Sequence, residues 1–414
     1  MGFLQEKTRL LVCLAAAVAF AGAAYADEYH YNSTIIGERP AGMGGAYTAV
    51  SDDASGLFHN PAGTVYSFGS NLSVSANAFS TSNKKYDNAG LNFSYERRSE
   101  TLQPNFFGVV QHTPYGTIGF SYAVQDSLLE EQNQTFYNPT TTVTEWTLNY
   151  LKEYNIYNIG PSIAWNVSKD LKVGISLYYY YKKYKIMNNS FQKYSNTTYN
   201  WANSLLREED QGGRPIIGIL YSPENGKYAV GLTATKTFLF NSDIYFQATQ
   251  KTPSPTPPTD YTTNPYFNIQ RFSSETNTPY TAKFGIAYFP SNKTLIAGDL
   301  SYTSAVTDIW GDHQPVINAA VGMEYYLSSS FAIRTGIFSD RSNTKAVATA
   351  ADPEHIDLYG ISFSGSYFVK GSAITVGFTD SFGSGQHWIN SASPTSGTMT
   401  MNNLMVFLGT SYSY

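Results

Sequence analysis

The sequence has little charge, almost no cysteine and no long apolar run beyond its first residues, and each shortage excludes a class of protein. Charged residues make up only 14% of the 414 residues, against roughly 25% in an average soluble protein. A bundle of membrane helices needs stretches of about 20 apolar residues, and none follows the N-terminal region. The formal net charge is -5 and no Lys/Arg-rich stripe occurs, which argues against nucleic-acid binding.

Aromatic and uncharged polar residues take the place of the missing charge. Aromatic residues make up 15% of the chain, including 34 tyrosines and 25 phenylalanines. Because disordered segments are poor in such residues, this abundance disfavours disorder. The composition fits a large all-β structure that has one apolar face and one polar, uncharged face.

The first 26 residues have the pattern of a secretory signal peptide. A basic start precedes the apolar run from Leu10 to Phe20, and Ala24-Tyr25-Ala26 supplies the small residues of a cleavage site. An N-terminal membrane anchor is the alternative, and the shortness of the apolar run argues against it. The only cysteine, Cys13, would leave with the signal peptide. The mature protein would then have no disulfide, no thiolate nucleophile and no Cys-ligated metal.

Beyond residue 26, apolar residues alternate with small or polar ones, which is the two-residue period of a half-buried β-strand. Short spacers rich in turn residues alternate with long ones. The long spacers, which we expect to be loops, are 80–103, 127–152, 188–212, 241–277, 307–314, 341–355 and 384–398. Tight turns at one end and long loops at the other are typical of an outer-membrane barrel, and a count of about fourteen strands is even, as bacterial single-chain barrels require.

A secreted β-sandwich is the soluble alternative, and it explains the strand period but not the alternation of loop lengths. The C-terminal end also favours a barrel. The chain ends in LMVFLGTSYSY, with Tyr412 and Tyr414 among its last residues. This ending resembles the terminal-strand signal that barrel assembly machinery recognises. We therefore expect an antiparallel barrel in the outer membrane of a Gram-negative bacterium, in contact with outer-membrane lipid.

Four consecutive predicted strands carry a charge on the polar face, which would line the lumen. These residues are Lys283, Asp299, Glu324 and Arg334. Two are basic and two are acidic, and any of them left unpaired would be costly in a packed interior. The pattern favours a network that neutralises itself and stiffens the barrel. The alternative is that some of these groups steer the head group of a substrate.

A glycine-rich segment, residues 37–63, precedes the first predicted strand. It contains neither GxxxxGK[ST] nor the strand–GxGxxG–helix unit of a dinucleotide site. Asp52, Asp53 and His59 match no zinc or EF-hand spacing, so we expect no metal and no cofactor. The two aspartates instead predict the start of a short helix over 54–58, which the Asn-Pro pair that follows would end.

The stretch GMGGAYTAVSDDASGLFHNPAG resembles the N-terminal plug, or hatch, of the FadL-type outer-membrane transporters of long-chain fatty acids and other hydrophobic compounds. The DDAS…NPAG pattern of that family falls on Asp52, Asp53, Ala54, Ser55, Asn60, Pro61, Ala62 and Gly63. A later hairpin is similar to one in the family at Pro279, Gly285, Tyr288, Pro290 and Asp299. The resemblance implies a fourteen-stranded barrel plugged at its periplasmic end. Ligand would enter from outside and leave sideways into the membrane through a kinked strand.

On this basis we expect a plug over residues 27–66 and a barrel over 67–414. Glycines would serve in the plug where a Cβ would clash or where φ is positive, and an Asn-Pro pair would fix the turn into the first strand. The predicted plug and gating residues are Gly42, Gly44, Gly45, Asp52, Asp53, Asn60, Pro61 and Gly63.

The predicted function is passive uptake of a hydrophobic small molecule, such as a long-chain fatty acid or an aromatic hydrocarbon. An enzyme is not expected, because neither HExxH nor GxSxG occurs and the six histidines are scattered. The GMGGAYTAV stretch also resembles the FadL-related PorV-type barrels, which are partners in protein secretion. A secretion or assembly partner is therefore the alternative function.

Overall fold

The computed structural model describes residues 29–413 except for 91–92, 225, 252–265, 274–276, 309–310, 350–351 and 389–395. The predicted signal peptide lies outside the described residues, as does Tyr414. Within the described part, no helix is both long and apolar enough to cross a bilayer.

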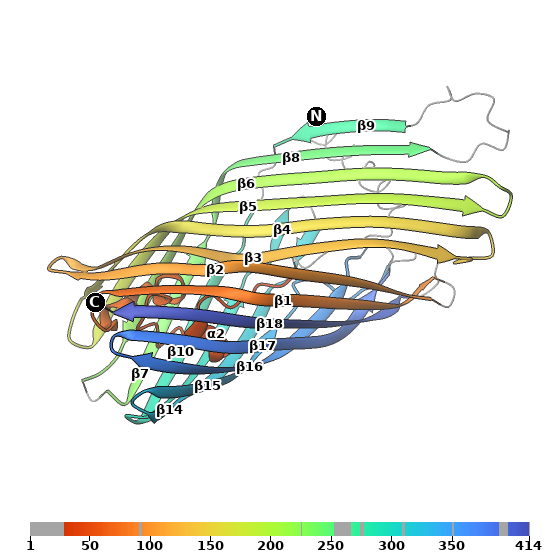
Figure 1. Ribbon diagram of the computed structural model, residues 1–414. Helices are drawn as coiled ribbons and strands as arrows, with labels where there is room; N and C mark the ends of the chain where they lie inside the picture. The colour runs from red at the N-terminus through yellow and green to blue at the C-terminus, as the bar shows by residue number, and fades with distance from the viewer. Residues whose placement is uncertain are drawn as a thin grey trace.

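The wall is a closed antiparallel barrel of fourteen strands, which confirms the predicted fold (Figure 1). The first six strands are β1 (Asn71–Gly90), β2 (Phe93–Thr113), β3 (Gly116–Tyr137), β4 (Val143–Asn166), β5 (Leu171–Tyr194) and β6 (Tyr199–Tyr221). The others are β7 (Tyr228–Lys236), β10 (Tyr280–Ser291), β11 (Thr294–Thr303), β14 (Val316–Ser328), β15 (Phe331–Asp340), β16 (His355–Val369), β17 (Ser372–His387) and β18 (Gly397–Ser413). Pairing of β1 with β18 closes the ring.

Two further hairpins are not part of the closed ring, although one of them pairs with it. Beyond Lys236, β8 (Phe238–Lys251) takes the place of β7 beside β6, and it pairs in turn with β9 (Tyr266–Phe272). The short strands β12 (Val306–Asp308) and β13 (Gly311–His313) pair only with each other among the described residues.

The strand period sets which side chains face lipid. On β5, Leu177 and Tyr179 are 53% and 44% exposed, whereas the alternating Ser176 and Tyr178 are buried in the lumen. Apolar side chains therefore cover the outside of the barrel and small or polar ones line the inside, as expected for a membrane-spanning sheet.

The outer parts of the first six strands correct the predicted loops. Residues 80–103, 127–152 and 188–212 mostly continue the β1–β2, β3–β4 and β5–β6 ladders. These segments are rich in Asn, Gln, Thr and charged residues, because beyond the bilayer neither face of a strand has to be apolar. In Figure 1 they form long hairpins that project away from the tight turns.

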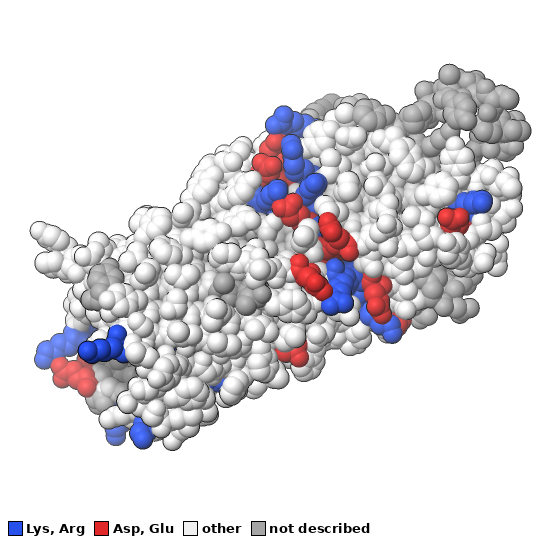
Figure 2. Space-filling model, in the orientation of Figure 1, with Lys and Arg blue, Asp and Glu red and all other residues white. Residues whose placement is uncertain are grey.

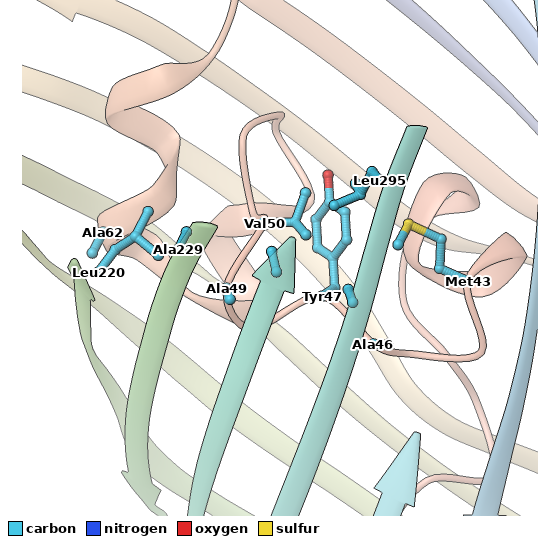
Figure 3. Close-up of a cluster of buried hydrophobic side chains, with 11 residues drawn as sticks. Met43, Ala46, Tyr47, Ala49, Val50, Ala62, Leu220, Ala229 and Leu295 are labelled. Carbon is cyan, nitrogen blue, oxygen red and sulfur yellow. The ribbon is translucent and has the colours of Figure 1, made fainter. Parts of the chain in front are cut away.

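The chain before β1 folds inside the barrel as a plug, which we define as residues 29–66. It contains α2 (Glu38–Gly42), α3 (Gly56–His59) and the 3-10 helix η1 (Pro61–Tyr66). The helix predicted over 54–58 begins two residues later. Side chains of the plug, including Met43, Tyr47 and Val50, pack with wall residues close to the tight turns, such as Leu220 and Leu295 (Figure 3). The plug therefore closes the end of the barrel where the short turns lie.

Glycines on the inner wall let the plug backbone approach the strands. A Cβ at Gly174 would lie 2.6 Å from the backbone N of Ala62. A Cβ at Gly409 would lie 2.6 Å from the Cβ of Glu38. The same close approach to the plug is found at Gly119, Gly218, Gly231, Gly285, Gly322 and Gly336. Since these glycines lie on many strands, the plug fits against the wall on most sides.

Candidate functional site

The main polar link between plug and wall is Arg39 of α2. Its guanidinium donates from Nε and Nη2 to the two carboxylate oxygens of Glu324 on β14, each at 2.9 Å. Nη1 of the same side chain donates to Asp52 of the plug. Glu324 also accepts from Nε of Arg334 on β15, at 2.5 Å. One buried carboxylate therefore lies between two guanidinium groups, one from the plug and one from the wall.

The predicted network of four lumenal charges exists only in part. Glu324 and Arg334 form an ion pair, but Asp299 accepts instead from the backbone amides of Tyr47 and Thr48, at 3.0 and 2.9 Å. Lys283 is half-buried, and it forms no ion pair with any carboxylate in the described part of the chain. Three of the four groups thus fix the wall or the plug, and both Lys283 and Asp299 border the inner lumenal cavity described below.

Two of the predicted plug glycines lie where the plug touches β15 and β16. A Cβ on Gly42 would overlap the side chain of Ser364. Gly44 has a φ of +64°, and a Cβ there would lie 3.2 Å from the backbone N of Ile337. Both positions therefore require the smallest residue, one for space and the other also for backbone conformation. Gly45, also at positive φ, lies near Ile35 of the plug.

Asn60 connects the plug to β6 and starts η1. Its Nδ2 donates to the carbonyl oxygens of Thr48, at 2.8 Å, and Ile219, at 3.1 Å. Its Oδ1 accepts from the backbone N of Ala62, as at a helix N-cap, and Pro61 follows at the first helical position. Asn60 and Pro61 thus end α3, but they begin η1 and do not turn directly into β1, which starts at Asn71. Gly63 packs against Ser51.

Asp52, Asp53 and His59 do not converge on one site, although Arg39 lies close to both aspartates. Asp53 accepts from the backbone N of Ser55, at 2.8 Å, which forms a turn before α3. His59 Nε2 lies 2.8 Å from the carbonyl oxygen of Ile36. Burial lowers the pKa of His59 to about 4. Among the described residues, no group of three or more His, Cys, Asp or Glu is arranged to hold a metal ion.

Two adjoining cavities lie in the lumen beyond the plug. The outer cavity has a volume of about 170 Å³ and is bordered by Tyr154, Tyr180 and Arg214. The inner cavity, of about 110 Å³, lies against plug residues such as Phe58 and is bordered by Lys283. The two share Tyr31, Gln125, Arg214, Thr235 and Thr281. They therefore adjoin along these five residues, with the outer cavity towards the outer lumen and the inner one against the plug.

A third pocket, the wall pocket, opens on the lipid-facing side of β14, β15 and β16. It has a volume of about 370 Å³ and its lining is almost entirely apolar, including Val321, Ile337 and Ile361. It shares four lining residues with the inner cavity: Ala319, Ala320, Phe338 and Ser339. The inner cavity and the lipid-facing surface are therefore separated here by a thin part of the wall.

The β14–β15 ladder stops at this thin part. The last paired residues are Ala320 and Phe338, although β14 begins at Val316 and β15 continues to Asp340. Beyond the ladder, the backbone N of Ala319 donates to the Ser339 hydroxyl at 2.9 Å. The half-buried Phe338 ring lies over Gly360 and packs with Ile35 of the plug. Phe338 is thus the largest of the four shared residues that lie between the inner cavity and the wall pocket.

Sequence reasoning missed Arg39, Arg214 and Phe338. Arg39 is the only Lys or Arg in the segment 37–63, which also holds three acidic residues, and this imbalance could have singled it out. Arg214 and Phe338 gave no such signal. The cavity at Arg214 is lined by strands distant in sequence, and no local pattern marks where the β14–β15 ladder stops. Tyr412 lies near the end of β18 and is 50% exposed. Its role in assembly stays a prediction, and its predicted partner Tyr414 is not among the described residues.

A closed barrel with an N-terminal plug, and with cavities that reach the lipid-facing wall, defines the class of plugged transmembrane β-barrels. The fold is that of the FadL-type outer-membrane channels. A FadL homologue of Pseudomonas aeruginosa matches with a TM-score of 0.64 and 11% sequence identity, over 91% of this chain and 98% of that one. The toluene transporter TbuX of Ralstonia pickettii matches with a TM-score of 0.62 and 12% identity, over 93% and 100%. The toluene transporter TodX of Pseudomonas putida matches with a TM-score of 0.59 and 16% identity, over 91% and 98%.

The resemblance noted in the sequence is therefore confirmed at the level of the fold. No protein-family model matches the sequence, and no curated protein matches it. Because identities this low establish only a shared architecture, the ligand has to be inferred from the residues of this chain.

Proposed function

We propose that this protein is a passive channel for the uptake of hydrophobic small molecules across the outer membrane of a Gram-negative bacterium. The observation that carries the proposal is the thin wall at Phe338, where the inner cavity and the wall pocket share four residues. The plug blocks the straight aqueous route through the barrel. A ligand that enters the outer cavity would pass to the inner cavity and leave sideways past Phe338 into lipid.

Two cations support a ligand with an acidic head group, such as a long-chain fatty acid. Arg214 borders both cavities, and its guanidinium lies 5.6 Å from the centre of the Phe58 ring. Lys283 borders the inner cavity. Neither forms an ion pair with a carboxylate among the described residues. A ligand carboxylate would gain charge-assisted hydrogen bonds from either group, while Tyr154 and Tyr180 offer aromatic surface to the chain.

Uptake of two probes in intact cells tests the route and the head group together. Ala319→Trp fills the wall pocket from the lipid side, and Ile374→Trp places the same side chain on the lipid face of β17. We expect Ala319→Trp to slow the uptake of both oleic acid and toluene, while Ile374→Trp leaves both at the wild-type rate. Arg214→Gln should raise the half-saturating concentration of oleic acid by about tenfold, for the loss of a charge-assisted hydrogen bond, and leave toluene uptake unchanged.

These variants also separate the proposal from the secretion-partner alternative. If wild-type cells take up neither probe faster than cells with an empty vector, the channel proposal is wrong. If uptake is fast but insensitive to Ala319→Trp, the lateral route at Phe338 is wrong while the uptake function stands.

A further inference from the structure

The outer surface of the wall changes from apolar to charged over a few residues along the strands. Tyr122, Tyr157 and Tyr181 form a stacked row across β3, β4 and β5, with ring centres 6.4 and 6.2 Å apart. They share the lipid-facing alternation of residues such as Ile159 and Tyr179, which are 42% and 44% exposed. Rows of aromatic side chains of this kind lie at the membrane interface of outer-membrane barrels.

A belt of charged side chains crosses the strands just beyond this row, on an otherwise almost uncharged surface (Figure 2). We define the charged belt as Glu153, Lys183, Lys185, Arg207, Glu209, Asp243 and Arg271, on β4, β5, β6, β8 and β9. Lys185 lies four residues beyond Tyr181 on the same face, about 13 Å along the strand. With a strand tilt of about 40°, this is about 10 Å further along the membrane normal. The belt is therefore at the height of lipid head groups.

Ion pairs within the belt neutralise some of its cations. Lys183 pairs with Glu153 at 2.8 Å, and Arg271 with Asp243 at 2.8 Å. Lys185 has no such partner among the described residues, although the strand register sets it opposite Glu153, whose carboxylate bonds to Lys183. Of the two belt cations on β5, Lys183 has an acidic partner among the described residues and Lys185 has none.

Lys185 also lies directly opposite Arg207 in the β5–β6 ladder. Like charges at directly opposed positions destabilise a sheet. Arg207 is compensated only in part, because the carboxylate of Glu209 is 3.8 Å away and that of Asp243, which also interacts with Arg207, is hydrogen-bonded to Arg271. Its guanidinium lies 5.6 Å from the centre of the Tyr245 ring, and its side chain is 47% exposed. An exposed guanidinium and a half-buried ammonium group thus face outward side by side, and an anion between them would remove the repulsion.

We propose that Lys185 and Arg207 bind the phosphate group of a phosphorylated glycolipid in the outer leaflet. The inference rests on the outer-membrane location under the proposed function, and it concerns the outer surface of the wall, not the lumen. A guanidinium binds phosphate through two parallel hydrogen bonds, and an ammonium adds a point charge. Basic clusters at membrane interfaces bind phosphorylated head groups in this way. The aromatic row below the belt would contact the acyl chains of the same lipid.

Native mass spectrometry of the full-length barrel, extracted in mild detergent, tests the site. The test variant is Lys185→Gln with Arg207→Gln, and the matched control is Lys169→Gln with Lys293→Gln, which removes the same charge from tight turns at the opposite end. We expect diphosphorylated lipid A to bind the wild type and the control equally, and to bind the double variant about tenfold more weakly. The dephosphorylated glycolipid should bind the wild type as weakly as diphosphorylated lipid A binds the double variant.

Other outcomes overturn the proposal. Equal binding of lipid A by the wild type and the double variant, or equal loss in the control, would show that the two cations do not form the site. Displacement of lipid A by millimolar inorganic phosphate would identify a site for free phosphate instead. Lys185→Gln alone removes a like-charge contact, so it should fold at least as well as the wild type and still lose most of the binding. Oleic acid uptake should be unchanged in all these variants, so a failure of the lipid site and a failure of the channel proposal remain distinguishable.

Discussion

In two of the buried charge clusters inside the barrel, a carboxylate lies between two cations. In the lower cluster Glu324 lies between Arg39 of the plug and Arg334 of the wall. In the upper cluster Glu130 on β3 lies 3.6 Å from Lys84 on β1 and 3.9 Å from Arg97 on β2. Lys84 also pairs with Glu354, just before β16, at 3.2 Å. The lower cluster therefore joins the plug to the wall, whereas the upper one joins parts of the wall to one another.

The residues that surround the two clusters also differ. The guanidinium of Arg97 lies over the rings of Tyr86, Tyr95 and Tyr150, with its carbon 5.1, 5.2 and 4.4 Å from the ring centres. Such cation–π contacts inside a dry interior stabilise the hairpins that project beyond the membrane. The lower cluster has polar partners from the plug instead. Similar buried charges therefore stiffen the wall in one place and attach the plug to the wall in the other.

The largest effect is expected from Glu324→Gln. It leaves the guanidinium groups of Arg39 and Arg334 close together without a carboxylate between them. Breaking a buried ion pair by removing one partner costs about 3–5 kcal/mol, and here most of this cost falls on the attachment of the plug. We therefore expect a folded barrel whose single-channel conductance in planar bilayers is larger and noisier than that of the wild type.

Glu130→Gln makes the same chemical change in the upper cluster and serves as the matched comparison. Because no plug residue contributes an ion pair to this cluster, we expect a lower melting temperature with conductance like that of the wild type. Similar conductance changes in both variants would show that the two clusters do not have separate roles.

The two clusters also show what the sequence could predict. Glu324 and Arg334 lie on strands with a clear two-residue period, so their lumenal face could be assigned directly. Lys84, Arg97 and Glu130 lie in segments predicted as loops, because both faces of those strands are polar outside the bilayer. The barrel and the plug were therefore predictable, but the upper cluster was not.

Contacts between distant elements set a second limit. The sequence indicated Asn60 as a turn residue, but its bonds to Thr48 and Ile219 depend on how the plug sits against β6. The thin wall at Phe338 likewise depends on where the β14–β15 ladder stops, which no local pattern encodes. Residues that act within one element could be predicted, and residues that act between elements could not.

A smaller effect on the plug is expected from replacing Asn60 and Pro61 together with Ala. The double variant leaves two carbonyl oxygens without their donor and the amide of Ala62 without its acceptor, at about 1–3 kcal/mol for each buried group left unsatisfied. The ion pairs of Arg39 remain, so the barrel should assemble and the plug should loosen less than in Glu324→Gln. Planar-bilayer recordings of both variants give the comparison. Conductance identical to the wild type would mean that this link does not hold the plug.

The smallest effect is a pH dependence carried by Glu38, a buried plug residue outside the membrane-spanning strands. Its carboxylate accepts from the Ser73 hydroxyl at 3.1 and 3.3 Å. Burial, with repulsion from Asp53, raises the pKa of Glu38 from its ordinary value of 4.5 to about 7. Its contribution to stability is therefore complete below pH 4.5 and is lost as the pH rises through 7. His59 acts in the opposite direction, because its lowered pKa makes stability fall as the pH drops from 6.5 towards 4.

Glu38→Gln should separate these two contributions. Glutamine has the size of the acid but never ionises, so the variant should gain plug stability at pH 8.5, by at most about 3 kcal/mol, and gain nothing at pH 4.5. Conductance noise in planar bilayers should therefore be lower than in the wild type at pH 8.5. On acidification the noise of the variant should increase, because only the loss of stability linked to protonation of His59 remains. Glu224→Gln removes an exposed carboxylate from a tight turn and should follow the wild type at every pH. A variant at Glu38 that also follows the wild type would show that this buried carboxyl does not govern how firmly the plug is held.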